Sequence, residues 1–176
     1  METLMPAWIG LGSNIGRGRE QLSAAWQRLG ELPGIRTVKI SHPWNTSPVD
    51  MVSDNWFTNA AGSLEVCLSP EELLDALKMV EADFGRTGGK QGSGYQDRPL
   101  DLDLLYYGED GAHVVDSCDL VVPHPFISRR LFVLLPLTEI EPLLVDPKTR
   151  RTVTEMGKEL LKRETGQQLE VSDWNK

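Results

Sequence analysis

Two aspartates two positions apart are the residues of this chain best suited to chemistry. Asp101 and Asp103 lie in the segment RPLDLD, which starts at Arg98 and places leucines at the alternating positions. Side chains alternate between the two faces of a β-strand, so both carboxylates should project from one face while Leu100 and Leu102 face the core. Paired carboxylates on a rigid strand suit Mg²⁺, which takes one or two protein carboxylates and completes its shell with water and substrate phosphates. The alternative is an ordinary solvated strand face, where acid pairs are common.

Positive side chains lie close to this pair in the sequence. Arg86 lies near the start of the segment 85–97, which contains five glycines and Lys90, and Arg98 directly follows it. The planar guanidinium of arginine binds phosphate oxygens in a bidentate manner. Arginines next to paired carboxylates therefore favour a combined phosphate and metal site, although each arginine alone could simply lie on the surface.

An aromatic residue and an amide form a second candidate group. Phe57 and Asn59 lie two positions apart on a predicted strand and share a face. The ring can stack on a flat heterocycle and the amide can form paired hydrogen bonds with its edge. Core packing is the alternative for Phe57, whereas Asn59 stands among apolar neighbours and needs a specific polar partner.

The glycines of the segment GLGSNIG, residues 10–16, do not form a standard nucleotide loop. A dinucleotide fingerprint requires glycine where Ile15 stands, and the Gly-Lys-Ser/Thr of a phosphate loop is absent. We interpret these glycines as permitting a tight turn between a strand and a helix.

Composition indicates one soluble globular domain. The 176 residues are 40% hydrophobic and 25% charged, and the net charge of −8 argues against general nucleic-acid binding. No apolar run is long enough to span a membrane and no signal-peptide pattern is present, so we expect a cytoplasmic protein. Cys67 and Cys118 are interpreted as core or near-core residues in a reducing compartment, without the spacing of a zinc site.

Strand and helix patterns alternate along the chain. Strands are predicted at 8–11, 35–41, 57–66 and 98–107, and helices at 19–32, 70–84, 128–135 and 153–162. The hairpin-like pair 35–41 and 57–66 favours an α+β fold of ferredoxin-like character, with a mixed or antiparallel sheet flanked by helices. We expect a single domain over residues 1–165 and a polar, loosely attached C-terminal tail at 166–176. The polar stretch 42–55 is predicted to be a binding loop.

Seven short motifs, in this order, carry a resemblance to a known family. They are GLGSN at 10–14, TSP at 46–48, FTNA at 57–60, Glu81 with Gly85 and Arg86, RPLDLD at 98–103, PHP at 123–125, and RLFVL at 130–134 followed by PL at 136–137. The chain resembles 6-hydroxymethyl-7,8-dihydropterin pyrophosphokinases from about Ile9 to Pro142.

This resemblance implies an ATP-dependent diphosphokinase of folate biosynthesis. Such an enzyme transfers pyrophosphate from ATP to the hydroxymethyl group of the dihydropterin and releases AMP. By resemblance, two Mg²⁺ ions bind Asp101 and Asp103. The implied catalytic residues are Arg86, Arg98, Asp101 and Asp103. The implied pterin contacts are Thr46, Ser47, Pro48, Val49, Phe57, Asn59 and Phe132. The implied ATP contacts are Glu81, Arg86, Arg98, Leu104, His124 and Arg130.

Two other functions fit the same residues. A different Mg²⁺-dependent phosphoryl or nucleotidyl transferase would keep the aspartate pair but need no pterin site. A catalytically silent homologue would bind pterin or nucleotide without turnover. For the pyrophosphokinase we expect a monomer whose partners are ATP and the dihydropterin, with no nucleic acid or membrane. We also predict that the segment 85–97 closes over ATP and carries Arg86 and Lys90 to the phosphates.

Overall fold

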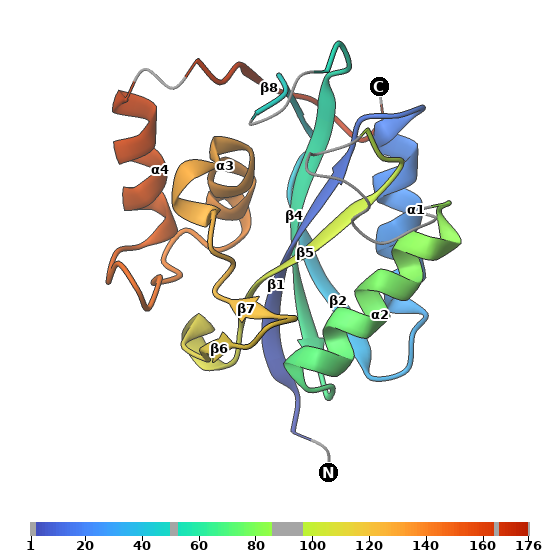
Figure 1. The fold of residues 1–176 in the computed structure, drawn as a ribbon, viewed down its shortest axis with the longest axis vertical. Coiled ribbons are helices and arrows are strands. Elements are labelled where there is room, and N and C mark those ends of the chain that lie inside the picture. The colour runs from blue at the N-terminus through green and yellow to red at the C-terminus, as the bar shows by residue number, and fades with distance from the viewer. Residues whose placement is uncertain (1–2, 50–52, 86–96, 164–165, 176) are drawn as a thin grey trace.

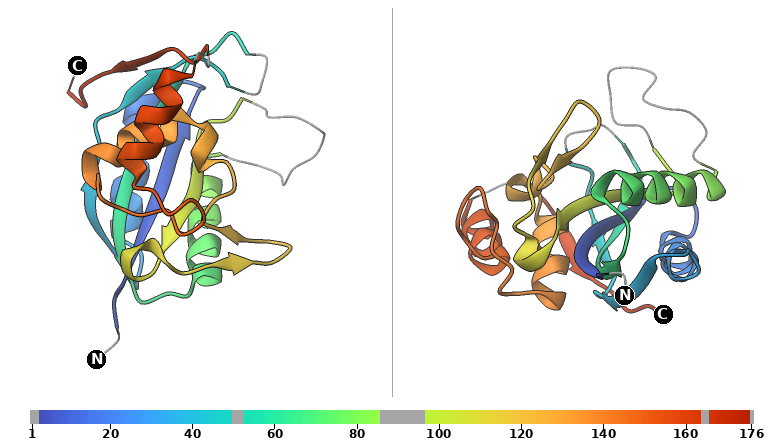
Figure 2. Two further views of the ribbon diagram at one scale, coloured as in Figure 1. Left: turned by 90° about the vertical axis from the view of Figure 1, so that its left-hand side faces the viewer. Right: turned by 90° about the horizontal axis from the view of Figure 1, so that it is seen from below.

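The structure is a computed structural model that describes residues 3–49, 53–85, 97–163 and 166–175. Helices cover both faces of one central sheet (Figures 1 and 2). The strands are β1 (Met5–Ser13), β2 (Ile35–Ile40), β3 (Trp44–Thr46), β4 (Phe57–Val66), β5 (Asp101–Tyr107), β6 (Val115–Asp116), β7 (Val121–Val122) and β8 (Leu169–Val171). The helices are α1 (Gly18–Gly30), α2 (Pro70–Asp83), α3 (Leu131–Ile140) and α4 (Val153–Lys162), with short 3₁₀ turns at Glu109–Gly111 and Ile127–Arg129.

The central sheet has the strand order β5-β1-β4-β3-β8, and β2 pairs with the other end of β4. Every strand pair that the structure describes is antiparallel, so the prediction of an α+β domain with an antiparallel sheet is confirmed. Within the described ranges, no helix is long and apolar enough to cross a membrane.

Two apolar cores hold the three layers together. The first joins the sheet to α1 and α2 and contains Ile9, Leu22, Leu77 and Leu102. The second joins the other face of the sheet to α3 and α4 and includes Leu134. Alternation along each strand sends successive side chains into opposite cores, which is why the central strands are apolar on both faces.

Capping sequences mark the starts of α2 and α4. Ser69 begins α2 with a capping box, in which its hydroxyl accepts from the Glu72 N–H and the Glu72 carboxylate accepts from the Ser69 N–H. Thr152 and Glu155 form the same arrangement before α4, whose bounds match the prediction. Each cap satisfies backbone donors that a helix leaves without partners at its first turn.

Helix α3 begins later than predicted, at Leu131 rather than residue 128, and extends to Ile140. Its sequence is apolar on nearly every side and contains Pro136, so no amphipathic period marks its ends. Val38, in the strand predicted at 35–41, is 46% exposed, because a register shift between Thr37 and Lys39 interrupts the alternation in β2. Cys118, expected near the core, is exposed.

The C-terminal segment is not loosely attached, contrary to expectation. Leu169–Val171 forms β8 and pairs with β3, a strand inside the predicted loop 42–55. The Trp174 indole Nε1–H donates to the Ser41 carbonyl at 3.0 Å. A three-residue strand of mixed polarity carries too little pattern to be recognised without its partner.

Two glycines provide opposite tests of this packing. In Gly62→Ala the new Cβ would overlap the Trp26 ring, so we expect a loss of about 1–3 kcal/mol in the free energy of unfolding. In Gly157→Ala the Cβ meets Leu134 at an ordinary 3.8 Å, and replacing a helical glycine should stabilise by up to about 1 kcal/mol. Urea unfolding measures both. Equal changes in the two variants would contradict the packing described for Trp26.

Candidate active site

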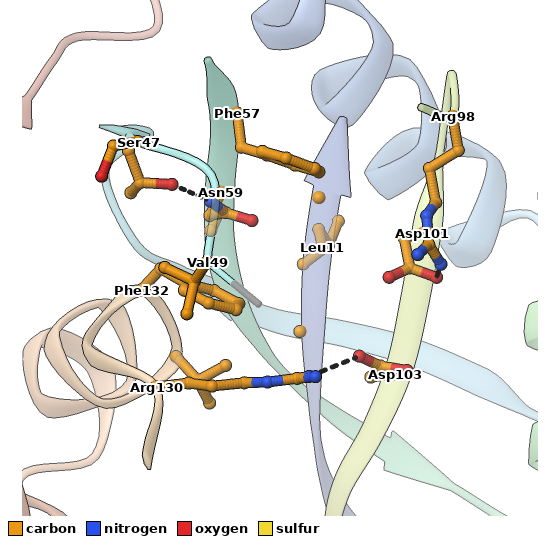
Figure 3. A pocket seen from close by; sticks show the side chains of 15 residues that line it. Leu11, Ser47, Val49, Phe57, Asn59, Arg98, Asp101, Asp103, Arg130 and Phe132 are labelled. Atoms are coloured by element: carbon orange, nitrogen blue, oxygen red, sulfur yellow. Dashed lines mark hydrogen bonds and ion pairs between the residues drawn. The ribbon is translucent and has the colours of Figure 1, made fainter. Parts of the chain in front are cut away.

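An open cavity lies over the face of the sheet formed by β5, β1 and β4 (Figure 3). Its wall opposite β5 comes from α3 and from the segment that follows β3. The lining residues are Gly10, Leu11, Gly12, Thr46, Ser47, Val49, Phe57, Asn59, Ala60, Arg98, Asp101, Asp103, Arg130, Phe132 and Val133.

Two glycines of β1 leave the floor of this cavity open. Gly12 lies between Asn59 of β4 and Asp101 of β5, and Gly10 is paired with Asp103 in the same way. A Cβ on Gly12 would stand 2.9 Å from Asn59 Oδ1, closer than real contacts allow. The interpretation of these two glycines as turn residues is therefore wrong. They lie within a strand, and only Gly16, with φ of 76°, adopts the turn conformation that favours glycine.

The side of the cavity along β5 is charged. Arg98 Nη1 donates to Asp101 Oδ1 at 2.7 Å, and Arg130 Nη1 and His124 Nε2 each stand 3.9 Å from Asp103 Oδ2. The structure thus brings together five of the predicted site residues, with the two carboxylates on one face of the strand as the alternation predicted. Leu100 and Leu102 are buried on the opposite face.

Asp103 carries a poorly compensated charge. Burial, followed by repulsion from Asp101, raises the pKa of Asp103 to about 7, although Arg130 opposes the shift. The side chain is 36% accessible and lines the cavity. The charged form of Asp103 is therefore disfavoured in this site, a cost that a nearby positive charge reduces.

The opposite side of the cavity is aromatic and neutral. Phe57 from β4 and Phe132 from α3 lie on either side of Asn59 (Figure 3). Asn59 Nδ2 donates to Thr46 Oγ1 at 2.8 Å, which orients the amide and leaves Oδ1 towards Gly12. Buried Asn59 therefore has the specific polar partner that its position required, and Val49 closes this side.

Several predicted residues lie outside the cavity lining. The Leu104 side chain is buried in the core between the sheet and α1 and α2. Buried Glu81 belongs to α2, and its Oε1 accepts from the Leu102 N–H at 2.7 Å, along the outer edge of β5. Pro48 is half-buried between two lining residues. Arg86 and the loop closure predicted for residues 85–97 lie outside the described residues, as does Lys90.

Sequence reasoning missed Asp97, which ties three segments together beside the cavity. Its Oδ1 accepts from Asn14 Nδ2 at 2.6 Å and Ser53 Oγ at 2.8 Å, and its Oδ2 accepts from Asn55 Nδ2 at 2.9 Å. The hydrogen bond from Ser53, then that from Asn14, lowers the pKa of Asp97. The Asn14 backbone N–H and side-chain carbonyl also bond to the Arg98 main chain. These contacts are far apart in sequence, so no local spacing signalled them.

Comparisons with known proteins agree with this geometry. Residues 8–142 match the family model for 7,8-dihydro-6-hydroxymethylpterin-pyrophosphokinase (HPPK). The chain is 41% identical over 139 residues to a 2-amino-4-hydroxy-6-hydroxymethyldihydropteridine pyrophosphokinase of Methylorubrum extorquens, covering 79% of this chain and 84% of that one. A Pseudomonas aeruginosa protein of the same name is 36% identical over 143 residues, covering 81% and 85%.

Longer proteins also match. A mitochondrial folate synthesis bifunctional protein of Arabidopsis thaliana is 40% identical over 141 residues, which cover 80% of this chain but 24% of that protein. The crystal structure of wild-type Plasmodium falciparum HPPK-DHPS with SDX-DHP superposes with a TM-score of 0.73 at 12% identity. That match covers 94% of this chain and 46% of the other, so the chain spans less than half of that protein and the likeness shows the fold alone.

The raised pKa of Asp103 predicts a pH-dependent stability. A carboxyl whose pKa rises on folding stabilises the protein below its ordinary value of 3.8, and this contribution is lost as the pH rises through about 7. Asp103→Asn should therefore match the wild type at the acidic end and be more stable above neutral pH. Urea unfolding with a chelator present measures this, with Asp116→Asn on an exposed strand as the control. A difference independent of pH would contradict the charge assignment.

Proposed function

The chain belongs to the 7,8-dihydro-6-hydroxymethylpterin-pyrophosphokinase family, and from this premise we propose how its cavity carries out the reaction. The protein is an ATP-dependent diphosphokinase that transfers pyrophosphate in folate biosynthesis. We propose that the acceptor is the hydroxymethyl group of 6-hydroxymethyl-7,8-dihydropterin and that AMP is released. One observation carries the proposal: a single cavity joins an aromatic, amide-bearing side to a carboxylate and arginine side across a glycine floor.

The aromatic side would hold the pterin. A flat ring placed between Phe57 and Phe132 gains stacking contacts on both faces, and Asn59 lies within reach of its polar edge. Thr46 holds the Asn59 amide in one orientation, so hydrogen-bond donors and acceptors are fixed before the ligand arrives. Ser47, Pro48 and Val49 would complete this subsite.

The carboxylate side fits Mg²⁺. Among the described residues, no group of three or more His, Cys, Asp or Glu side chains could hold a metal alone. Asp101 and Asp103 together offer the one or two carboxylates that Mg²⁺ usually takes, with water and phosphate oxygens as the remaining ligands. The raised pKa of Asp103 supports this proposal, because a bound cation would reduce the cost of its charged form. When bound, Mg²⁺ neutralises phosphate charge and lowers the pKa of a coordinated hydroxyl.

The protein groups position the reactants and balance their charge. The Gly10 and Gly12 floor lets a substituent on the pterin reach from the aromatic side towards Asp103 without meeting a side chain. Transfer of a phosphoryl-type group depends mainly on such in-line placement and on charge stabilisation. Arg98 is held against Asp101 and Arg130 faces Asp103, so both guanidinium groups can bind phosphate oxygens.

The remaining predicted residues take supporting roles in this proposal. His124, 3.9 Å from Asp103, would approach the nucleotide from the same side as Arg130. Arg86 would bind phosphates, and Glu81 and Leu104 would support ATP through their places beside and behind β5. We further propose a cytoplasmic monomer without nucleic-acid partners, since one chain supplies both sides of the cavity and the net charge is −8.

The two competing functions are distinguished by the products. We expect AMP rather than ADP, and only when the dihydropterin is present, because the acceptor must bridge the two sides. Asp101→Asn should lower turnover about a hundredfold or more while leaving the fold intact. Chromatographic separation of the nucleotides measures this. ADP formation, or turnover without pterin, would indicate another transferase, and pterin binding without AMP would indicate a silent homologue.

The aromatic walls predict a selective binding defect. Phe57→Ala and Phe132→Ala each remove a stacking partner worth roughly 0.5–1.5 kcal/mol beyond area burial, so the pterin Kd should rise roughly tenfold. The affinity for a non-hydrolysable ATP analogue should change by less than about twofold in Phe57→Ala, and by less than the pterin affinity in Phe132→Ala, whose ring packs on Arg130. Calorimetric titration measures both affinities, and the ATP analogue serves as the control for the pterin in each variant. Equal losses for both ligands would mean general damage to the fold.

A further inference from the structure

The C-terminal segment contacts both walls of the aromatic side, although it lies beyond residues 8–142 that match the family model. We propose that Gln167 is a positioning residue that sets the start of α3 and thereby places Phe132 and Arg130 against the substrate. The proposal rests on the proposed function, because its consequence is measured through pterin binding.

The start of α3 lacks a cap of its own. Arg130 precedes the helix and makes no side-chain capping bond, so the first helical N–H needs an outside acceptor. Gln167 Oε1 accepts from the Leu131 N–H at 3.0 Å, and Gln167 Nε2 donates to the Arg129 carbonyl at 3.2 Å. One amide thus bonds the backbone on both sides of Arg130.

Arg130 lies between the two bonded residues, Arg129 and Leu131, and Phe132 follows them. Both Arg130 and Phe132 line the cavity. The Arg130 side chain is only 6% exposed, and its guanidinium lies 5.5 Å from the Phe132 ring centroid. Phe132 follows one residue after Leu131 in the first turn of the helix. A shift of the helix start would therefore move the ring and the guanidinium together.

The neighbouring residue fixes the opposite wall. The Ser47 N–H donates to the Gln168 carbonyl at 2.9 Å, and the Gln168 N–H donates to Ser47 Oγ at 3.0 Å. The pairing continues as β3 against β8, from Thr46 opposite Leu169. Gln167 thus bonds to the start of α3, and Gln168 bonds to the segment after β3. These two elements form the two walls of the proposed pterin site, so the C-terminal segment sets the distance between them.

The matched control is one residue away. Gln168 uses its backbone, and its exposed side chain makes no hydrogen bond within the part of the chain that the structure describes. Gln167→Ala should raise the pterin Kd roughly three- to tenfold, the loss expected when one or two hydrogen bonds no longer hold a wall. Gln168→Ala should leave it unchanged. Because the same shift moves Arg130, Gln167→Ala should also weaken binding of the ATP analogue, whereas Gln168→Ala should leave that affinity at the wild-type value.

A double-mutant cycle separates positioning from general stability. If Gln167 acts through Phe132, its substitution should have little further effect on the pterin Kd in a Phe132→Ala background. Gln167→Glu keeps the acceptor for the Leu131 N–H but loses the donor to Arg129, so its effect should be intermediate. Thermal unfolding checks that each variant is folded. Gln167→Met, which fills the same space, replaces Gln167→Ala if the latter does not fold.

The outcomes are distinct. A wild-type protein that binds no pterin would overturn the proposed function itself. A wild-type protein that binds pterin while Gln167→Ala and Gln168→Ala behave alike would overturn only the role of Gln167. Effects of Gln167→Ala and Phe132→Ala that add fully would also overturn it, since they would show that Gln167 does not act through that ring.

Discussion

The pairing register of β5, β1 and β4 is the constraint on which the cavity depends. It places Asp101, Gly12 and Asn59 in one row across the sheet. Adjacent strands are about 4.8 Å apart, so the two polar side chains stand roughly two spacings apart with an open glycine between them. A slip of one residue in β5 would turn both aspartates into the core and expose Leu102 instead, at a cost that the buried leucines make prohibitive. Burial of the leucines on one face of β5 therefore determines which side chains point into the cavity from its other face.

The same register concentrates negative charge that the described part of the chain neutralises only in part. Arg98 contacts Asp101 directly, whereas Arg130 and His124 stand 3.9 Å from Asp103, and burial together with repulsion from Asp101 raises the pKa of Asp103. Closer contacts would stabilise the free protein and would also fill the space that a metal ion and phosphates need. The ligand-free site is therefore less stable than it could be, and the missing stabilisation becomes binding energy when cations and phosphates arrive.

Local patterns were sufficient for the parts of this site that lie within single strands. Alternation in RPLDLD placed the aspartates on one face, and the polarity of Asn59 among apolar neighbours indicated a buried partner. Contacts between distant segments left no such trace. Asp97 and Gln167 are ordinary polar residues in sequence, and their roles depend on partners 36 to 83 residues away. The purpose of Gly10 and Gly12 was misjudged for the same reason, since the side chains that they leave room for belong to other strands.

The walls of the cavity are held by amides, whereas its floor is held by apolar packing. Asn14, Asn55 and Gln167 each bond one segment beside the cavity to another, Asn14 from a buried position and the other two near water. An amide both donates and accepts, so a single side chain can bind two backbone or carboxylate groups in a defined orientation. Such bonds contribute only modestly on balance, because water replaces them when they break near the surface. Walls built in this way are placed accurately and can still adjust when a substrate enters, while the sheet that carries Asp101 and Asp103 cannot shift without disrupting both cores.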